Sequence, residues 1–382
     1  MVKILIAGDY APSERVAELV NVNKFEQIFG EVSKYTSEVD YSIVNLESPV
    51  VNSNAAMPID KCGPSLKCNT SAIHAIKYAG FDMVTLANNH FYDYGEDGVK
   101  DSIQSCIDNE IEFVGGGFNV DQAGKTFYKN IKGVRFAFIN CCENEFSIAQ
   151  SNKGGSNPIN PIKQFYDIKD ASHNADVVVV IAHGGPEGYE YPTPRMKELF
   201  HFFIDCGADV VVNHHQHCYS GYEYYHDKLI VYGLGNFSFD ESSMNDPKWN
   251  KGYMGILKFF EGRIELDCIP YSQGIMESPG IKILEGPALT AFHQNIDYIN
   301  SVINNDTLLL RHYNDFLEQK AASYLIALEP YTNKYLRAAR YKNLIPSTLS
   351  KDRAFQILDF IICESHLERM RYALEQACKH KL

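Results

Sequence analysis

The sequence predicts an α/β domain followed by a helical C-terminal appendage. Up to about residue 285, short apolar runs rich in valine and isoleucine alternate with amphipathic helical patterns, as in an α/β fold. Beyond that point only amphipathic helical patterns remain. A chain of 382 residues is long enough for one large domain plus an appendage. We therefore expect an α/β domain over residues 1–285 and a helical extension over residues 286–382.

The expected elements follow in order along the chain. Buried strands are indicated at residues 2–7, 41–44, 83–87, 112–114, 134–140, 177–182, 209–212 and 229–234, and residues 252–259 and 263–269 alternate as an antiparallel hairpin. Helices are indicated at residues 16–28, 70–78, 97–109 and 195–206, and in the extension at 296–303, 313–328, 333–341 and 351–378. The glycines at 115–117 lack the lysine and Ser/Thr of a phosphate loop, so a tight turn is the better interpretation.

Charge and composition exclude some partners. A formal net charge of −13 argues against a nucleic-acid backbone or an anionic membrane as the main partner. The sequence starts directly with a strand pattern and contains no apolar run long enough to span a membrane, so we expect a cytoplasmic protein. The ten cysteines fit free thiols. For Cys62 and Cys68, whose spacing matches no common zinc motif, structural thiols are favoured over a disulfide or a metal site.

Polar residues recur directly after the expected strands. In the stretch DMVTLANNHFYDYG (residues 82–95), an apolar run ends abruptly in two amides and a histidine. Taken alone, this stretch is explained equally well by a capped turn. Carboxylates, amides and imidazoles that converge on one sheet edge, however, are what a divalent transition-metal site needs. The positions with this pattern are Asp9, Glu47, Asn89, His183, His215 and His217.

The pair His215 and His217 is informative because of its spacing. In an extended backbone, residues two apart point to the same side, so both imidazoles are expected to face one site. His214 points the other way and is expected to pack or to support the ligands.

The sequence resembles the poly-γ-glutamate capsule biosynthesis CapA family, which is related to the calcineurin-like metallophosphoesterases. The blocks GD, NLE, ANNHxxDYG, HGGxE, GADVVVNHHQH and LIVYGLGNF carry this resemblance over residues 3 to about 240. It implies a four-layer α/β/β/α metallophosphatase-like sandwich with a metal site at the carboxyl ends of the strands. It assigns Asp9, Glu47, Asn89, His183, His215 and His217 as metal ligands and His90 as the catalytic acid.

The resemblance also implies a cofactor and substrate-binding residues. One or two divalent ions (Mn, Fe or Zn) are expected. Arg15 lies near where many members carry an arginine, and we place it with Asn45, Glu187 and Asn236 among the substrate-binding residues. The chain departs from related phosphoesterases at D-x-H, because Tyr10 and Ala11 follow Asp9 and one ligand of the first metal is missing. It also has HGG where members commonly have HWG, and NHHQH where they have GHHPH.

The leading hypothesis is a metal-dependent hydrolase of CapA type that uses metal-activated water in the synthesis of a capsule or cell-surface polymer, poly-γ-glutamate or polysaccharide. The alternatives are a metallophosphoesterase for a small phosphorylated metabolite, and a non-catalytic assembly subunit of the same fold. The expected partners are a polymer or small-molecule substrate and a polymer-synthesis enzyme, with no nucleic acid and no membrane span.

Overall fold

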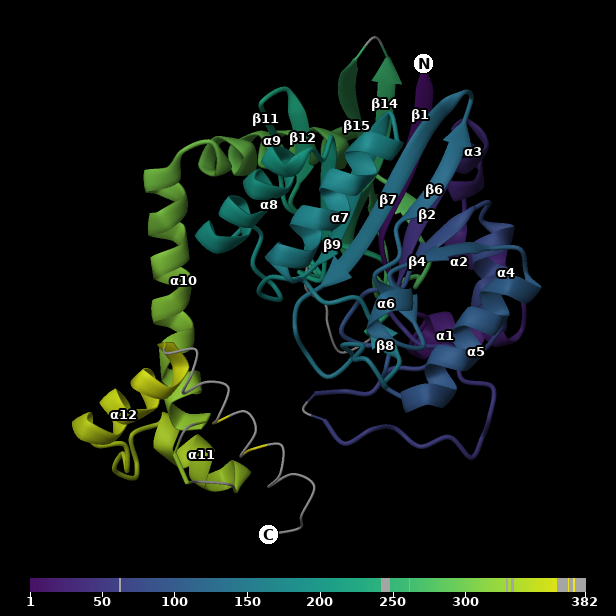
Figure 1. The fold of residues 1–382 in the computed structure, drawn as a ribbon. Helices are drawn as coiled ribbons and strands as arrows, with labels where there is room; N and C mark the ends of the chain where they lie inside the picture. Colours follow the sequence, from purple (N-terminus) through teal and green to yellow (C-terminus); the bar gives the residue numbers. More distant parts are fainter. Residues whose placement is uncertain are drawn as a thin grey trace. The chain divides into compact units, whose positions relative to one another are not determined.

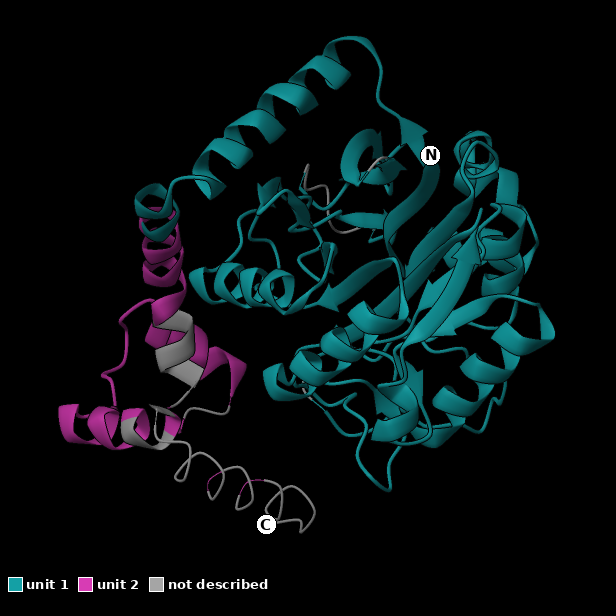
Figure 2. Ribbon diagram, turned by 45° about the horizontal axis from the view of Figure 1, so that its top comes forward, with its two compact units in different colours: residues 1–310 teal, residues 311–382 magenta. Residues whose placement is uncertain are grey.

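The chain is described here from a computed structural model, in which two compact units follow one another (Figures 1 and 2). The structure describes residues 1–61, 63–241, 248–260, 262–327, 329–330, 333–362, 370 and 374. Unit 1 comprises Met1–Leu310 and unit 2 comprises Arg311–Leu382.

The first sheet of unit 1 is built around four parallel strands and a hairpin. Its order is β16-β15-β14-β1-β2-β3-β4, and β13 pairs with β1 beside this path. The strands are β1 (Val2–Tyr10), β2 (Tyr41–Leu46), β3 (Met83–Thr85), β4 (Glu112–Val114), β13 (Asn236–Ser238), β14 (Lys251–Phe260), β15 (Arg263–Ser272) and β16 (Lys282–Ile283). Strands β1 to β4 are parallel, and the predicted hairpin β14–β15 joins β1 antiparallel.

The second sheet has a parallel centre and antiparallel edges. Its order is β11-β12-β10-β9-β7-β6, with only β11 and β6 antiparallel to their neighbours. The strands are β6 (Phe127–Ile131), β7 (Val134–Cys142), β9 (Val177–His183), β10 (Val210–His214), β11 (Tyr222–Tyr225) and β12 (Lys228–Val231). The predicted tight turn at residues 115–117 takes a different form, because Gly116–Gly117 forms β5 and pairs with β8 (Gly155–Ser156).

The two sheets pack face to face with helices on both outer sides, which confirms the predicted four-layer α/β/β/α arrangement (Figure 1). Alternation along β1 shows how the layers are held together. Ile4 and Ile6 point into the core between the sheets, whereas Leu5 and Ala7 point toward the helices. The helices on that side are α1 (Glu14–Asn21), α2 (Phe25–Phe29), α3 (Val32–Ser37), α4 (Ser71–Tyr78) and α5 (Gly95–Asp108).

The outer face of the second sheet is covered by α7 (Pro161–Asn174) and α8 (Pro194–Cys206). A short helix, α6 (Val120–Ala123), contacts β5 and β8. Helix α8 has clear local start and stop signals. Thr193 accepts a hydrogen bond from the Met196 amide at its N-terminus, Pro194 occupies the first turn, and Gly207 follows its last residue in the left-handed conformation.

The predicted helical C-terminal region forms four helices in the part of the chain that the structure describes. They are α9 (Gly286–Ile303), α10 (Asp306–Ala327), α11 (Lys334–Tyr341) and α12 (Lys351–Ile362); the rest of the helix expected up to residue 378 lies largely outside the described residues. Helix α9 belongs to unit 1, where Phe292 and Ile296 enter the core between the sheets. The first compact unit thus extends to residue 310 and includes α9, whereas the domain bounds 1–285 and 286–382 stay a prediction.

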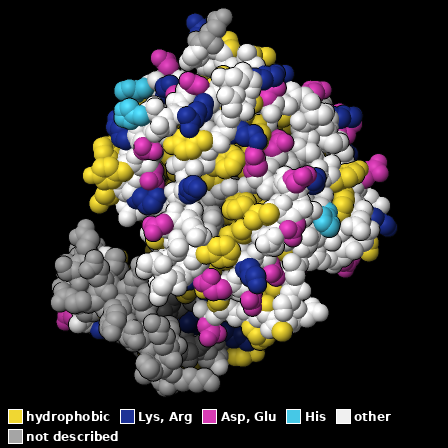
Figure 3. All heavy atoms as spheres, turned by 45° about the vertical axis from the view of Figure 1, so that its right-hand side comes forward, with side chains coloured by type: hydrophobic (Ala, Val, Ile, Leu, Met, Phe, Trp, Pro, Cys, Tyr) yellow, Lys and Arg dark blue, Asp and Glu magenta, His cyan; other side chains and the backbone are white. Residues whose placement is uncertain are grey.

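The surface of the described chain mixes both signs of charge. Figure 3 shows basic and acidic side chains interspersed on one face, with small groups of apolar side chains between them. No described helix is both long and apolar enough to cross a membrane.

Candidate metal centre

The carboxyl ends of the parallel strands from both sheets carry the predicted site residues. Asp9 lies near the end of β1, and Glu47 directly follows β2. His183 is the last residue of β9, whereas Asn89 follows β3, and His215 and His217 follow β10. All six side chains are buried. Because two packed sheets bring these strand ends together, the fold assembles residues that are far apart in the sequence.

Two glycines allow the close approach of β1 and β13 on which the site depends. A Cβ on Gly8 would lie 1.8 Å from the carbonyl oxygen of Gly235, so no larger residue fits there. Gly235 itself has φ +76°, a conformation that favours glycine. The parallel pairing of β1 with β13 places Asp9 opposite Asn236. The GD and GLGN blocks of the sequence are thus explained by one backbone contact.

The donor atoms of the predicted ligands converge. His183 Nε2 lies 3.1 Å from Asn89 Oδ1, 3.1 Å from His215 Nδ1 and 3.5 Å from Glu47 Oε1. His217 Nε2 lies 3.7 Å from the same Glu47 oxygen. Acids and imidazoles form three groups here, and within each group the donor atoms lie within 4.8 Å of one another. The groups are Glu47, His183 and His215; Asp9, Glu47 and His217; and Glu187, His215 and His217.

Glu47 is the least compensated group of this cluster. Its side chain is fully buried, and neither carboxylate oxygen has a hydrogen-bond partner among the described residues. Burial, and then the charges of Asp9, Glu187, Glu145 and Asp93, raise the pKa of Glu47 well above its ordinary value. A buried carboxylate without hydrogen bonds is costly unless a cation lies beside it. The surroundings of Glu47 therefore fit a metal ion.

The imidazoles are in the protonation state that ligation requires. Burial, reinforced by the neighbouring imidazoles, lowers the pKa of His183 well below its ordinary value, and burial with the charge of His217 lowers the pKa of His215 to about 3. Neutral histidine nitrogens and carboxylate oxygens form a typical donor set for zinc, manganese or iron. The residues present thus fit a divalent transition metal.

The backbone at the two histidines differs from the expectation. Strand β10 ends at His214, and both His215 (φ 91°) and His217 (φ 53°) have positive φ. The expectation of an extended backbone here was wrong, although both rings do face the cluster, with centroids 6.0 Å apart. The positive φ values at His215 and His217 bend the chain after β10, and this bend, not a strand, directs both rings to the same side.

Asn45, Asn236 and His214 lie behind the predicted ligands. Asn236 Oδ1 is 2.9 Å from His217 Nδ1, which leaves Nε2 of that ring directed at Glu47. Asn45 donates a 2.8 Å hydrogen bond to Asp9, and His214 Nδ1 lies 3.0 Å from the same oxygen. Burial alone would raise the pKa of Asp9, but the hydrogen bond and charge of His214 with the other imidazoles hold it below its ordinary value. As expected, His214 supports a predicted ligand, Asp9. Asn45 and Asn236, expected to bind substrate, contact the predicted ligands Asp9 and His217 in this structure.

His90 belongs to a separate buried group beside the cluster. Its Nδ1 lies 2.7 Å from Asp93 Oδ2, which also accepts a hydrogen bond from the Leu66 amide. Lys61, whose side chain is 5% exposed, pairs with the other oxygen of Asp93. Burial lowers the pKa of His90, and the hydrogen bond to Asp93 opposes this lowering only in part. Nε2 of His90 is the nitrogen that remains for a substrate.

The outer side of the cluster is acidic. Glu187 is exposed and groups with His215 and His217, and Glu145 Oε1 lies 4.0 Å from His215 Nε2. Burial and the charge of Glu187 raise the pKa of Glu145. Sequence reasoning missed Glu145, although the acids that follow β7 repeat the pattern of a polar residue after a buried strand.

Arg15, expected to bind a substrate anion, makes its ion pair with a carboxylate of the protein itself. Its guanidinium binds both oxygens of Asp240, at 2.8 and 2.6 Å, and the carbonyl oxygens of Gly274, Ile275 and Met276. Of the cysteine pair, Cys68 is a free thiol, and Cys62 lies outside the described residues.

These features define a class of protein: a four-layer α/β/β/α sandwich with a buried cluster of acids and imidazoles at the ends of its strands. The sequence model of the family described as "Bacterial capsule synthesis protein PGA_cap" matches residues 3–241. The chain belongs to this family, which confirms the resemblance seen in the sequence.

Two curated relatives are similar over the same region. The "Capsule biosynthesis protein CapA" of Bacillus anthracis is 35% identical over 244 residues, which are 62% of this chain and 59% of that protein. The "PGA biosynthesis protein CapA" of Bacillus subtilis is 32% identical over 238 residues, 61% of this chain and 62% of that protein. The match thus covers less than two thirds of the length of these relatives.

A solved structure of a hypothetical protein from Thermus thermophilus has a TM-score of 0.46 at 14% identity, and covers 71% of this chain and 99% of its own. This likeness is too remote to carry any inference about the chemistry of the present chain.

Proposed function

We propose that the chain is a metal-dependent hydrolase that acts in the synthesis of a capsule polymer. The observation that carries this proposal is Glu47, a fully buried carboxylate without hydrogen bonds that two imidazoles approach from different strands. A structural carboxylate would be hydrogen-bonded or ion-paired at this depth. A carboxylate that faces a cation needs neither.

Two ions are proposed, because two of the ligand groups share Glu47. One would be held by His183, His215 and the Asn89 amide, and the other by Asp9 and His217, with Glu47 facing both. Divalent ions there supply Lewis acidity, which polarises the bond under attack and makes a water molecule acidic enough to act as the nucleophile near neutral pH. Asn236 and Asn45 keep His217 and Asp9 in position.

His90 is proposed as the acid that protonates the leaving group. Asp93 fixes Nδ1 of its ring, so that Nε2 can hold the transferred proton. Lys61 balances the charge of Asp93. Glu187 is exposed at the outer side of the cluster, and we propose that it contacts the incoming substrate.

The proposed substrate is the polymer itself, rather than a small phosphorylated metabolite. The names of both curated relatives point to capsule or PGA biosynthesis. A synthesis enzyme for the same polymer is the proposed protein partner.

Metal content of the purified protein tests the proposal. We expect one or two equivalents of manganese, iron or zinc by elemental analysis in the wild type, and loss of metal in His215→Ala and in His217→Ala. His201→Ala is the matched control, because His201 lies on α8 and pairs with Glu223 away from the cluster. A wild-type protein that stays empty after incubation with these metals would contradict the hydrolase proposal and favour the assembly subunit.

The role of His90 is tested separately. His90→Ala should reduce turnover of a γ-glutamyl polymer by about 10²- to 10⁴-fold, the usual contribution of a general acid, and should leave the metal content unchanged. Metal loss in this variant would show that His90 is needed for the metal centre and not for proton transfer.

A further inference from the structure

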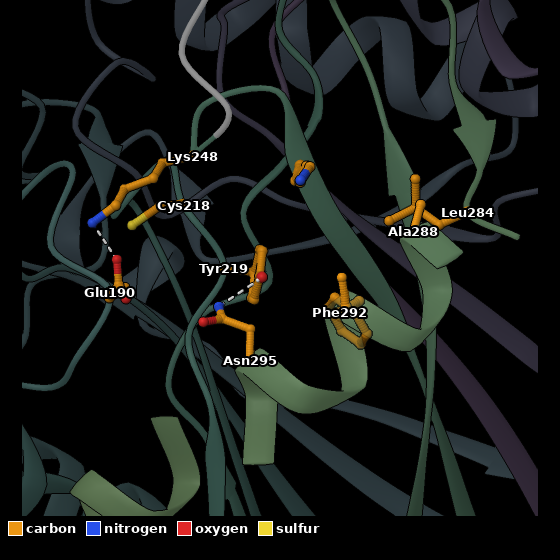
Figure 4. A pocket seen from close by; sticks show the side chains of 10 residues that line it. Glu190, Cys218, Tyr219, Lys248, Leu284, Ala288, Phe292 and Asn295 are labelled. Carbon is orange, nitrogen blue, oxygen red and sulfur yellow. Dashed lines mark hydrogen bonds and ion pairs between the residues drawn. The ribbon is translucent and has the colours of Figure 1, made fainter. Parts of the chain in front are cut away.

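A cavity of about 260 Å³ lies beside the candidate metal centre and takes no part in the function proposed above (Figure 4). We name it the lysine pocket. It is lined by one acid, two lysines, several apolar side chains and two polar groups: Glu190, Cys218, Tyr219, Lys248, Lys251, Leu284, Ala288, Ala291, Phe292 and Asn295.

Helix α9 forms one wall of the lysine pocket. Ala288, Ala291, Phe292 and Asn295 follow the spacing of one helical face, and the two alanines leave the space that the cavity occupies. Phe292 is buried and packs against the ring of Tyr219, with centroids 5.1 Å apart. Asn295 donates a 2.8 Å hydrogen bond to the Tyr219 hydroxyl, as Figure 4 shows. The wall is thus apolar, with one polar end.

The opposite side of the pocket carries an excess of positive charge. Lys248 pairs with Glu190, and Lys251 has no ion-pair partner among the described residues. Two lysines against one acid leave a net positive charge, in a chain whose formal net charge is −13. Cationic side chains in a concave site attract an anionic ligand. The apolar wall facing them favours an anion carried on aliphatic carbon over bare phosphate.

The lysine pocket and the metal centre share two segments of the chain. Cys218 and Tyr219 directly follow His217. Trp249, between the two lysines in sequence, lies against the His217 ring, with centroids 4.9 Å apart. The Trp249 carbonyl also accepts a hydrogen bond from Asn236, which holds His217. A chain bound in the pocket therefore lies next to the predicted ligands.

We propose that the lysine pocket is a subsite for one unit of a γ-linked glutamyl chain, an inference that rests on the hydrolase function proposed above. The carboxylate of the unit pairs with Lys251, next to the Lys248–Glu190 ion pair, and its methylene groups lie on Ala288, Ala291 and Phe292. Tyr219 and Asn295 are in place for the amide that links it to the next unit. At about 260 Å³, just below the ~300–1,000 Å³ typical of ligand pockets, the cavity suits a single unit. The neighbouring linkage is thereby presented to the metal centre.

Calorimetric titration with a short γ-glutamyl oligomer tests this proposal, first on chelator-treated protein and then on metal-loaded protein. We expect saturable binding in both. Trp249 is the only tryptophan of the chain, so its fluorescence gives a second readout of the same titration. Free glutarate distinguishes a chain from a small dicarboxylate: it should bind more weakly than the oligomer, and equal affinity would overturn the assignment to a chain. Inorganic phosphate should not compete.

Three variants complete the test. Lys251→Gln should weaken oligomer binding about tenfold, the loss of roughly one hydrogen bond to a charged group. Ala288→Phe should weaken it by filling the cavity without a change of charge. Lys258→Gln is the matched control, because Lys258 lies on the same strand, β14, and pairs with Asp267 outside the pocket. Undiminished binding in both Lys251→Gln and Ala288→Phe, or no binding by the wild type, overturns the proposal.

The two proposals fail in different ways. If the wild type binds the oligomer through Lys251 but holds no metal, the hydrolase function is wrong and the lysine pocket remains a binding site for the chain. If metal binds and the oligomer is cleaved with unchanged affinity and unchanged KM in Lys251→Gln, the subsite is wrong and the hydrolase function remains.

Discussion

The candidate metal centre and the lysine pocket lie side by side in unit 1 and have opposite electrostatic character. The metal centre buries Asp9 and Glu47 among imidazoles of lowered pKa, so its protein groups are negative overall. The lysine pocket is open, and its two lysines exceed its one acid. The first site therefore needs a cation and the second an anion. The uncompensated charge of each site thus indicates the charge of its ligand more directly than the shape of the site does.

The largest expected effect is stabilisation by metal. Adding manganese or zinc to chelator-treated protein at a thousandfold excess over its Kd should raise the free energy of unfolding by about 4 kcal/mol. The shift should disappear in Glu47→Gln, which removes a ligand of both proposed ions, and persist in Lys251→Gln. Thermal unfolding by circular dichroism with and without metal measures it. A shift of equal size in both variants would break the distinction between the two sites.

The pH dependence of the metal-free protein is the next largest effect. The pKa of Glu47 is raised in the folded state above its ordinary value of 4.5, so the folded state binds this proton more tightly than the unfolded chain does. Protonated Glu47 therefore contributes to the free energy of unfolding. This contribution is fully present below pH 4.5 and is lost as the pH rises through the folded-state pKa. Glu47→Gln lacks this loss and should be more stable than the chelated wild type by roughly 1–3 kcal/mol at neutral pH.

Urea unfolding of both chelated proteins at several pH values measures this difference. His183 and His215 titrate in both proteins and act in the opposite direction, because their lowered pKa values make stability fall as the pH is lowered. Their contribution largely cancels in the difference between the two proteins. A difference that shrinks as the pH rises would contradict the described surroundings of Glu47.

The supporting amide of Asn236 should have a smaller effect, confined to metal binding. Asn236→Ala removes the partner of His217 Nδ1 and should weaken metal affinity about ten- to a hundredfold, as found for residues that orient metal ligands. Thr193→Ala is the control for general destabilisation: the loss of this helix cap costs about 1 kcal/mol and leaves metal affinity unchanged. Competition with a fluorescent chelator measures both. Equal losses of affinity would mean that Asn236 acts only through overall stability.

The sequence predicted the strands of the sandwich because each long strand is an apolar run that ends in polar residues. It missed the two antiparallel edge strands of the second sheet, β6 and β11, and also β5, β8, β13 and β16, each two or three residues long, because long-range pairing and not local composition defines them. It also assigned the α9 region to the helical extension, because an amphipathic pattern alone does not show that Phe292 and Ile296 enter the core between the sheets.

The grouping of the site residues was predictable from the topology, but the contacts of individual side chains were not. Asp9, Glu47 and His183 could be grouped because the carboxyl ends of parallel strands meet at one edge. The contacts of individual amides were not predictable: Asn45 and Asn236 were expected to bind substrate and instead hold other side chains. The sequence pattern shows that an amide follows a buried strand, but it does not predict which side chain that amide will hydrogen-bond.

The smallest expected effect, salt dependence, separates the two sites most directly. Lys248 and Lys251 are exposed, so raising the ionic strength from about 0.01 to 0.1 M shortens the Debye length from about 30 to 10 Å and should weaken oligomer binding several-fold. The buried metal centre is screened much less, and its affinity for metal should change little over the same range. The fluorescence of Trp249, which lies against His217 and stands between the two lysines in sequence, can follow both titrations in one protein. Oligomer binding that is insensitive to salt would mean that the apolar wall of α9, and not the lysines, holds the chain.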